Sequence, residues 1–193
     1  MKRAEQKEKR RKEILIAGLD LFIRKGLAST KIQDIADAVQ MSVGLMFNYF
    51  DSKEKLYEEL IKSGIDAPTK MLKSIEGEGL IFFETIARQI FSLVKTENYI
   101  AKMFVLMNQA KHSESVPETV KPLLDGMDYM SVSVNKIEQG QKDLTIKDGD
   151  PVALAVAFWG AISGIAEEIA LGKNDVVPES DWVIDIIRRN SNG

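Results

Sequence analysis

The side chains that most often carry out catalysis or bind metal ions are scarce in this sequence of 193 residues. Cysteine is absent, and the single histidine, His112, stands between Lys111 and Ser113 in a stretch that reads as a loop. A thiol nucleophile, a disulfide, and a metal centre built from cysteines or several histidines are therefore excluded. The sequence also has no glycine-rich phosphate loop. We predict a protein that is not an enzyme and that holds no metal and no cofactor.

Basic side chains, which could bind an anionic partner, are concentrated at the N-terminus. The whole chain has a formal net charge of −3, whereas seven bases and two acids occupy the first dozen residues. Such a run is often only solvated surface, but it can also form an arm that contacts the phosphates or the minor groove of DNA. The residues assigned to this arm are Lys7, Lys9, Arg10, Arg11 and Lys12.

The elements that must position these side chains are helices, because apolar residues recur at helical spacing along the whole chain. A first helix of about 15 residues is expected to end at Gly26, and a short one follows over 32–39. Thr30 with Gln33 has the spacing of a capping box before this second helix. Ser42 can cap a third helix, and longer helices follow from about residue 66. The fold class is all-α.

Residues 31–50, KIQDIADAVQMSVGLMFNYF, have the pattern of a helix-turn-helix. Two short helices are joined by about three residues, and Ile32, Ile35, Val39 and Met46 can hold them together. The second helix of such a motif is braced from behind so that its outer face can enter the major groove. Short helical hairpins are also common as purely structural units, so the pattern alone leaves that alternative open.

The surrounding sequence resembles the TetR family of bacterial transcription regulators. The matching features are RKGLASTKIQDIADAV, then Ser42 with Gly44, then NYFDSKEKLY, within residues 10–62. The resemblance implies a three-helix DNA-binding domain, placed at 1–52, and a larger helical domain for ligand binding and dimerisation, placed at 53–193. It also implies DNA contacts from Thr30, Lys31, Ser42, Val43, Gly44, Leu45, Phe47, Asn48, Tyr49 and Lys53.

Three positions depart from the family pattern or need a separate argument. Gln40 stands in the turn where the family often has glycine, so a left-handed backbone there would cost about 1 kcal/mol. Phe47 replaces a common tyrosine and loses its hydroxyl contact to phosphate. Lys53 opposes the helix dipole at the start of the fourth helix, which a bound phosphate would make favourable.

The expected recognition helix contains no arginine or lysine. Bidentate reading of guanine is therefore excluded for it, which leaves Asn48 for adenine and Leu45 or Val43 for thymine methyl groups. We predict modest direct readout, supplemented by the basic residues of the N-terminus.

The second half of the chain is rich in methionine and aromatic residues, which suit a pocket for a small apolar or amphipathic effector. The same residues could equally form plain core. The resemblance implies that ligand binding in this half weakens binding to DNA. The candidate pocket residues are Met103, Phe104, Met107, Met127, Met130, Phe158 and Trp159.

The segment 152–166 is apolar around its whole circumference and must be covered on every side. Because Gly160 and Gly164 flank Ser163, one face could meet a second copy of the same helix in a homodimer. The alternative is the central helix of a monomeric bundle. The candidate interface residues are Trp159, Gly160, Ser163, Gly164, Trp182 and Ile186.

The charged N-terminus is unlike a signal peptide, and the uncharged run of 15 residues at 152–166 is shorter than a bilayer span. We therefore expect a cytoplasmic protein with no membrane partner. The predicted function is that of a repressor that leaves a palindromic operator in double-stranded DNA when a small apolar ligand binds. A DNA-binding protein without an effector, constitutive or controlled by a protein partner, is the alternative.

Overall fold

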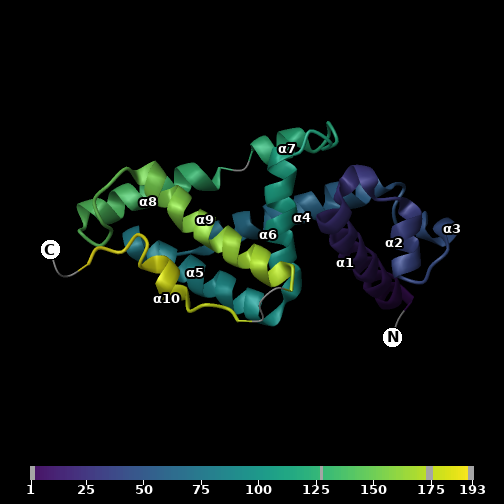
Figure 1. Cartoon of the computed structure of the whole chain (residues 1–193), viewed down its shortest axis with the longest axis horizontal. Coiled ribbons are helices and arrows are strands. Elements are labelled where there is room, and N and C mark those ends of the chain that lie inside the picture. Colours follow the sequence, from purple (N-terminus) through teal and green to yellow (C-terminus); the bar gives the residue numbers. More distant parts are fainter. Residues whose placement is uncertain (1–2, 127, 173–175, 191–193) are drawn as a thin grey trace. The chain divides into compact units, whose positions relative to one another are not determined.

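The computed structural model describes residues 3–126, 128–172 and 176–190, and it confirms the all-α fold class (Figure 1). In these residues the only pairing of extended backbone is an isolated bridge between Ile146 and Arg188. Met127, one of the candidate pocket residues, lies outside the described residues.

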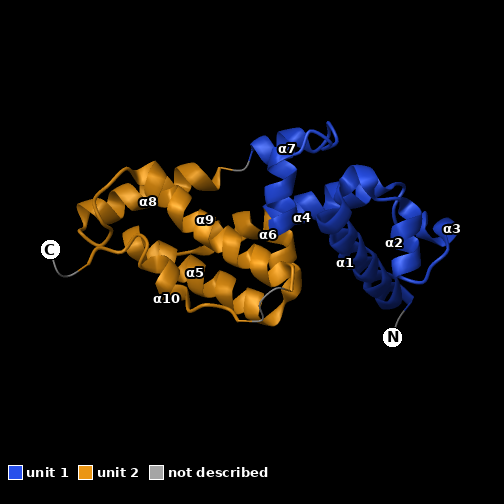
Figure 2. Cartoon of the chain, in the orientation of Figure 1, with its two compact units in different colours: residues 1–65, 105–126 blue, residues 66–104, 127–193 orange. Residues whose placement is uncertain are grey.

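The chain divides into two compact units (Figure 2). Unit 1 comprises residues 1–65 and 105–126, and unit 2 comprises residues 66–104 and 127–193. The first unit therefore extends beyond the expected boundary at residue 52. The physical reason is that α4 (Lys53–Ser74) begins at that boundary and packs its first turns against α1 (Arg3–Ser29).

Unit 1 contains α1, α2 (Ile32–Ala38), α3 (Val43–Met46), the first part of α4, the end of α6 (Asn98–His112) and α7 (Lys121–Asp125). Gly26, with φ 77° and ψ 161°, interrupts the helical backbone of α1. The expected stop at Gly26 is therefore confirmed, and helical turns resume only as far as Ser29. Glycine suits this position because φ in this range strains other residues.

The contact between α1 and α4 forms the core of unit 1. A Cβ at Gly18 would lie 2.5 Å from Leu56 Cδ2, so the side chain of Leu56 on α4 occupies the space that a larger residue at position 18 would need. The rings of Phe22 and Tyr57 meet edge to face with their centroids 5.2 Å apart. Burial raises the pKa of Tyr57 to about 12.

Unit 2 contains α5 (Gly79–Thr96), α8 (Tyr129–Lys142), α9 (Pro151–Ala170) and α10 (Ser180–Ile184), with the adjoining parts of α4 and α6. Its core is a series of edge-to-face aromatic contacts, in which Phe83 meets Phe158 at 4.9 Å and Trp159 meets both Phe158 and Tyr129 at 5.3 Å. Asp150 caps α9 by accepting from the backbone N–H groups of Val152 and Ala153.

Helix α9 is covered on one face only within unit 2, where Phe158 and Ile162 are buried, whereas Val156 on another face is 55% exposed. This agrees with the expectation that the fold covers one face and leaves another. The helix is 20 residues long, because it continues beyond the uncharged run through Glu167 and Glu168 to Ala170. By length and composition it could cross a membrane, which is weak evidence because a core helix of a soluble protein passes the same test.

Candidate nucleic-acid interface

The second helix of the predicted motif, α3, is a single turn with an exposed outer face. The Ser42 Oγ accepts a hydrogen bond from the N–H of Leu45 at 3.2 Å, which confirms Ser42 as the N-cap. Met46 is buried behind the helix, while Leu45 and Phe47 are 47% and 49% exposed. Five further candidates belong to this segment, in which Ser42, Gly44 and Asn48 are exposed and Val43 and Tyr49 are half-buried.

In the turn between α2 and α3, Gln40 has the left-handed backbone for which glycine is the usual residue. Its φ is 53°. Its N–H donates to the carbonyl of Asp37, and the N–H of Met41 donates to the carbonyl of Ala36 at 2.8 Å. The left-handed conformation costs a residue with a side chain about 1 kcal/mol, so the hydrogen bonds of this turn must hold it in place.

The start of α2 corrects one expectation about Thr30. The side chain that receives the Lys31 N–H is the Asp34 carboxylate at 3.1 Å, so the capping box of Thr30 with Gln33 was wrong. Gln33 instead donates to Asp37 at 2.6 Å. Thr30 is fully buried, and its hydroxyl donates to the carbonyl of Gly26 at 2.8 Å, whereas Lys31 is exposed. The contacts of both residues with DNA stay predictions.

Lys53 lies against the end of α1 rather than facing outward. Its ammonium donates to the carbonyls of Leu27 at 2.8 Å, Ala28 at 3.3 Å and Thr30 at 2.7 Å. An ammonium has three N–H donors, and all three are matched by these carbonyls. The carbonyls lie at the C-terminal end of α1, where further helical N–H partners are absent, which is why a cation is favourable there. The structure therefore gives Lys53 partners inside the fold, and its contact with phosphate stays a prediction.

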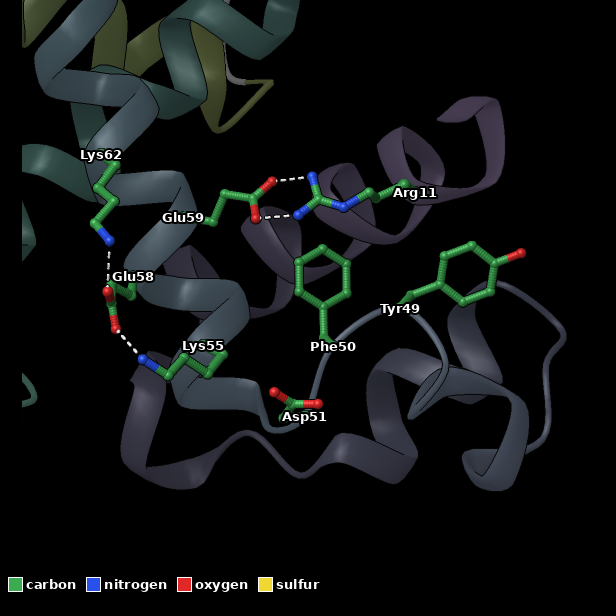
Figure 3. Close-up of a pocket in the computed structure, with 8 residues that line it drawn as sticks. All are labelled: Arg11, Tyr49, Phe50, Asp51, Lys55, Glu58, Glu59 and Lys62. Atoms are coloured by element: carbon green, nitrogen blue, oxygen red, sulfur yellow. Dashed lines mark hydrogen bonds and ion pairs between the residues drawn. The ribbon is translucent and has the colours of Figure 1, made fainter. Parts of the chain in front are cut away.

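The basic residues expected to form an arm lie on α1, and two of them are bound within unit 1. Arg10 donates to the carbonyl of Val39 at 2.7 Å and pairs with Glu13 at 2.6 Å. Arg11 donates through both terminal nitrogens to the Glu59 carboxylate (Figure 3). This bond raises the pKa of Arg11. The remaining members, Lys7, Lys9 and Lys12, are exposed.

Acidic side chains near the motif are matched by neighbouring cations or N–H groups. The backbone N–H of Lys31 and the ammonium of Lys25 lower the pKa of Asp34. On α4, Lys62 and Lys55 hold the pKa of Glu58 at about 2, so this carboxylate stays ionised and bound to both lysines at neutral pH.

Lys31 is the one cation within 31–50. The outer face of α3 is therefore apolar and uncharged rather than basic.

Sequence comparison identifies the motif. The sequence profile of the bacterial regulatory proteins of the tetR family matches residues 14–60, which span the core of unit 1 and the whole motif. The chain belongs to the TetR family of transcription regulators. It is a DNA-binding regulator of that family.

Individual relatives are distant, and they match the chain to different extents. The transcriptional repressor KstR2 of Rhodococcus jostii is 25% identical over 158 residues, which cover 79% of this chain and 75% of the relative. The uncharacterised regulator YfiR of Bacillus subtilis is 35% identical over 77 residues, covering 39% of this chain and 38% of the relative.

Solved TetR-family structures show the same fold. KstR2 of Mycobacterium tuberculosis, described as a ketosteroid transcriptional regulator, has a TM-score of 0.73 at 18% identity, and the match covers 94% of this chain and 96% of that one. AibR, solved with isovaleryl coenzyme A and operator DNA, has a TM-score of 0.66 at 18% identity, covering 91% and 94%.

The candidate pocket residues of this TetR-family chain do not line the apolar cavity of unit 2. Phe158 is fully buried in the aromatic core, and Trp159 donates through Nε1 to the Ser133 Oγ at 2.9 Å. Met103 and Met107 are buried, and Phe104 and Met130 are half-buried. The cavity described in unit 2 measures about 10 Å³ and is lined instead by Ile90, Phe91, Val94, Ile162, Ile165, Ala166 and Val177.

The candidate dimer residues divide between exposed and half-buried positions. On α9, Gly160 and Gly164 are exposed, while Trp159 and Ser163 are half-buried. At the C-terminus, Trp182 is 67% exposed and Ile186 is half-buried. A Cβ at Gly160 or Gly164 would meet nothing within 4 Å. The fold of unit 2 therefore does not itself require glycine at these positions.

The two lysines assigned to DNA, Lys31 and Lys53, can be separated by salt dependence. For binding to random-sequence duplex DNA, Lys31→Ala is expected to make the negative slope of log affinity against log salt shallower by about 1, because one phosphate contact is lost. Lys53→Met is expected to leave the slope unchanged and to lower the free energy of unfolding by about 1–3 kcal/mol, because three carbonyls lose their donor. The opposite pattern for Lys53→Met, a lower slope at unchanged stability, would return Lys53 to the phosphate contacts.

Proposed function

We propose that this TetR-family chain is a cytoplasmic homodimeric repressor that reads a palindromic operator with α3 and leaves it when a small apolar or amphipathic ligand binds unit 2. Repression is supported by the names of the KstR2 relatives, which are transcriptional repressors. A cytoplasmic location follows from the need to reach DNA. The observation that carries the proposal is the exposed outer face of α3.

That face has the composition of a surface that meets base edges. Leu45 and Phe47 are nearly half exposed although both are large and apolar, which is unusual for a surface without a partner. Asn48 is exposed beside them. Asparagine can pair with adenine through two hydrogen bonds, and apolar side chains contact the methyl group of thymine. Because no arginine or lysine lies within 42–50, the half-sites are expected to be rich in A·T pairs.

Gly44 supports the same assignment by its surroundings. A Cβ at this position would meet no atom of the protein within 4 Å, so packing within unit 1 does not require glycine there. Glycine also weakens a helix by about 1 kcal/mol relative to alanine. A close approach of DNA to the backbone of α3 accounts for a glycine that the fold does not need.

The substitution Gly44→Ala therefore separates folding from binding. We expect the free energy of unfolding to stay the same or to rise by up to about 1 kcal/mol. Affinity for a duplex enriched by the wild-type protein from random-sequence DNA is expected to fall by about tenfold or more, equivalent to 1.4 kcal/mol. The measurements are thermal unfolding and fluorescence anisotropy. Unchanged affinity for the enriched duplex would contradict the assignment of Gly44 to the DNA-facing surface.

The exposed face of α9 supports the homodimer. Val152, Val156, Gly160 and Gly164 follow one another at intervals of four residues, so they lie along one face, and all four are exposed. The glycines leave open space in which the backbone of a second helix can lie close. A dimer places two α3 helices on one duplex, with half-sites one helical turn or a multiple apart.

The substitution Gly160→Leu tests this interface. A Cβ at this position would meet nothing within 4 Å, and leucine favours helix, so the fold is expected to remain intact, while a partner helix would be pushed away. We expect Gly160→Leu to elute as a monomer in size-exclusion chromatography with light scattering, and the wild type as a dimer. The control is Ser92→Leu, an exposed position of α5, which is expected to remain dimeric. A dimeric Gly160→Leu variant would contradict this placement of the interface.

The effector requires unit 2 to change shape. The cavity between α5, α9 and Val177 is apolar but, at about 10 Å³, has room for no more than about one water molecule. Its lining is aliphatic except for Phe91, and a larger ligand can enter only if these side chains move. The structure of AibR contains isovaleryl coenzyme A together with operator DNA, which makes an acyl-coenzyme A thioester the first probe to test.

We expect isovaleryl coenzyme A, or a longer acyl thioester, to raise the melting temperature of the protein and to weaken its binding to the enriched duplex. Both effects follow by linkage from a ligand that binds better to the form with low DNA affinity. Free coenzyme A serves as the matched control for the acyl group. If a panel of acyl thioesters and sterols changes neither quantity, the alternative of a constitutive or partner-controlled regulator is favoured.

A further inference from the structure

Helix α3 has four residues, so its direction must be set by the segments on either side of it. One hydrogen-bonded turn is at the unfavourable stage of helix formation and has little stability of its own. The segment before it is the turn 39–42, and the segment after it runs through Phe50 to the start of α4. Whatever holds these two segments determines how α3 is presented.

Arg10 holds the segment before α3. Its Nη2 donates to the carbonyl of Val39, the residue that directly follows α2, at 2.7 Å. Its Nη1 is fixed by Glu13 one turn further along α1 at 2.6 Å. The turn in which Gln40 keeps its left-handed backbone is thereby tied to α1.

Arg11 holds the segment after α3. Its guanidinium lies over the ring of Phe50, with Cζ 4.8 Å from the ring centroid, and binds both carboxylate oxygens of Glu59 on α4. Figure 3 shows the ring of Phe50 beside the paired groups. Phe50 is 5% exposed and its N–H donates to the carbonyl of Met46, the last residue of α3. The Arg11 cluster, formed by Arg11, Glu59 and Phe50, thus joins α1, α4 and the end of α3.

The ion pairs of this region have separate partners. Glu58, next to Glu59, is bound by Lys55 and Lys62 at 3.0 and 2.6 Å, all three on α4. Glu59 is left to Arg11, and the pair has a net charge of zero. A neutralised guanidinium attracts phosphate only weakly, whereas the planar bidentate pair fixes the angle between its two helices.

We infer that Arg10 and Arg11 are positioning residues that set the direction of α3 for reading DNA, and that Glu59 is required for this although it is an acid in a DNA-binding unit. The inference rests on the proposed function, in which α3 reads the operator. A role of Arg11 as a phosphate contact would predict the opposite effect of removing Glu59 on binding to DNA. If Arg11 acts through its charge on DNA, removing Glu59 frees that charge and strengthens binding. If Arg11 acts by position, removing Glu59 weakens recognition.

The experiment compares Glu59→Gln with Glu58→Gln in the full chain. Both variants remove one negative charge from adjacent positions of α4, but only the first breaks the Arg11 cluster. Affinity is measured for the enriched duplex and for random-sequence duplex, each over a range of salt. Glu59→Gln is expected to lose about tenfold in the ratio of the two affinities, while Glu58→Gln keeps the ratio of the wild type. The salt slope of Glu59→Gln is expected to equal that of Glu58→Gln, because no phosphate contact is lost.

A double variant and the ratio of the two affinities separate positioning from loss of the fold. Arg11→Ala combined with Glu59→Gln is expected to reduce the affinity ratio no further than either single variant, because both break the same pair. A partly unfolded protein loses affinity for both duplexes alike, so the ratio does not depend on the folded fraction. Equal or tighter binding of the enriched duplex by Glu59→Gln than by Glu58→Gln overturns the inference. A wild-type protein that enriches no sequence overturns the proposed function instead.

Discussion

A recognition helix of four residues cannot keep its own direction, and the structure of unit 1 is arranged around this constraint. Leu56 of α4 packs its side chain against Gly18 of α1. Met46 is buried behind α3, and Ser42 caps the turn. Cations then complete the support, since Lys53 holds the carbonyls at the end of α1 and the two arginines hold the chain on either side of α3. The outer face of α3 is left apolar and uncharged, which favours readout by contact over attraction by charge.

Helix α9 also has a surface that the fold leaves uncovered. This helix is apolar on faces that unit 2 does not cover, and glycine occurs there where nothing in the chain needs it. Glycine costs helix stability, so its presence is best explained by a close neighbour outside the chain. The small cavity beside α5 and α9 adds a second constraint, because a ligand can enter only if these helices or their side chains move. In the proposed homodimer, movement of these elements would link ligand binding to the spacing of the two α3 helices.

Features set by local physics could be predicted from the sequence, and features set by tertiary contacts could not. The stop at Gly26, the cap at Ser42 and the left-handed Gln40 depend on neighbouring residues and agree with the structure. The partners of charged side chains could not be predicted in this way. Nothing near Arg11 in the sequence indicates that Glu59, 48 residues away, is its partner. Likewise, the carbonyls that receive Lys53 precede it by more than 20 residues, at the end of α1.

Methionine and aromatic stripes were ambiguous for a related reason, because core and pocket use the same residues. Phe158 belongs to the aromatic core, which only the pairing of α5 with α9 reveals.

A crystal structure with the enriched duplex would show whether α3 is held by internal cations and reads DNA with an uncharged face. We expect α3 in the major groove, with Arg11 still on Glu59 and Lys53 still on the carbonyls of residues 27–30. Arg11 or Lys53 paired with DNA phosphates, and Glu59 released, would contradict this expectation.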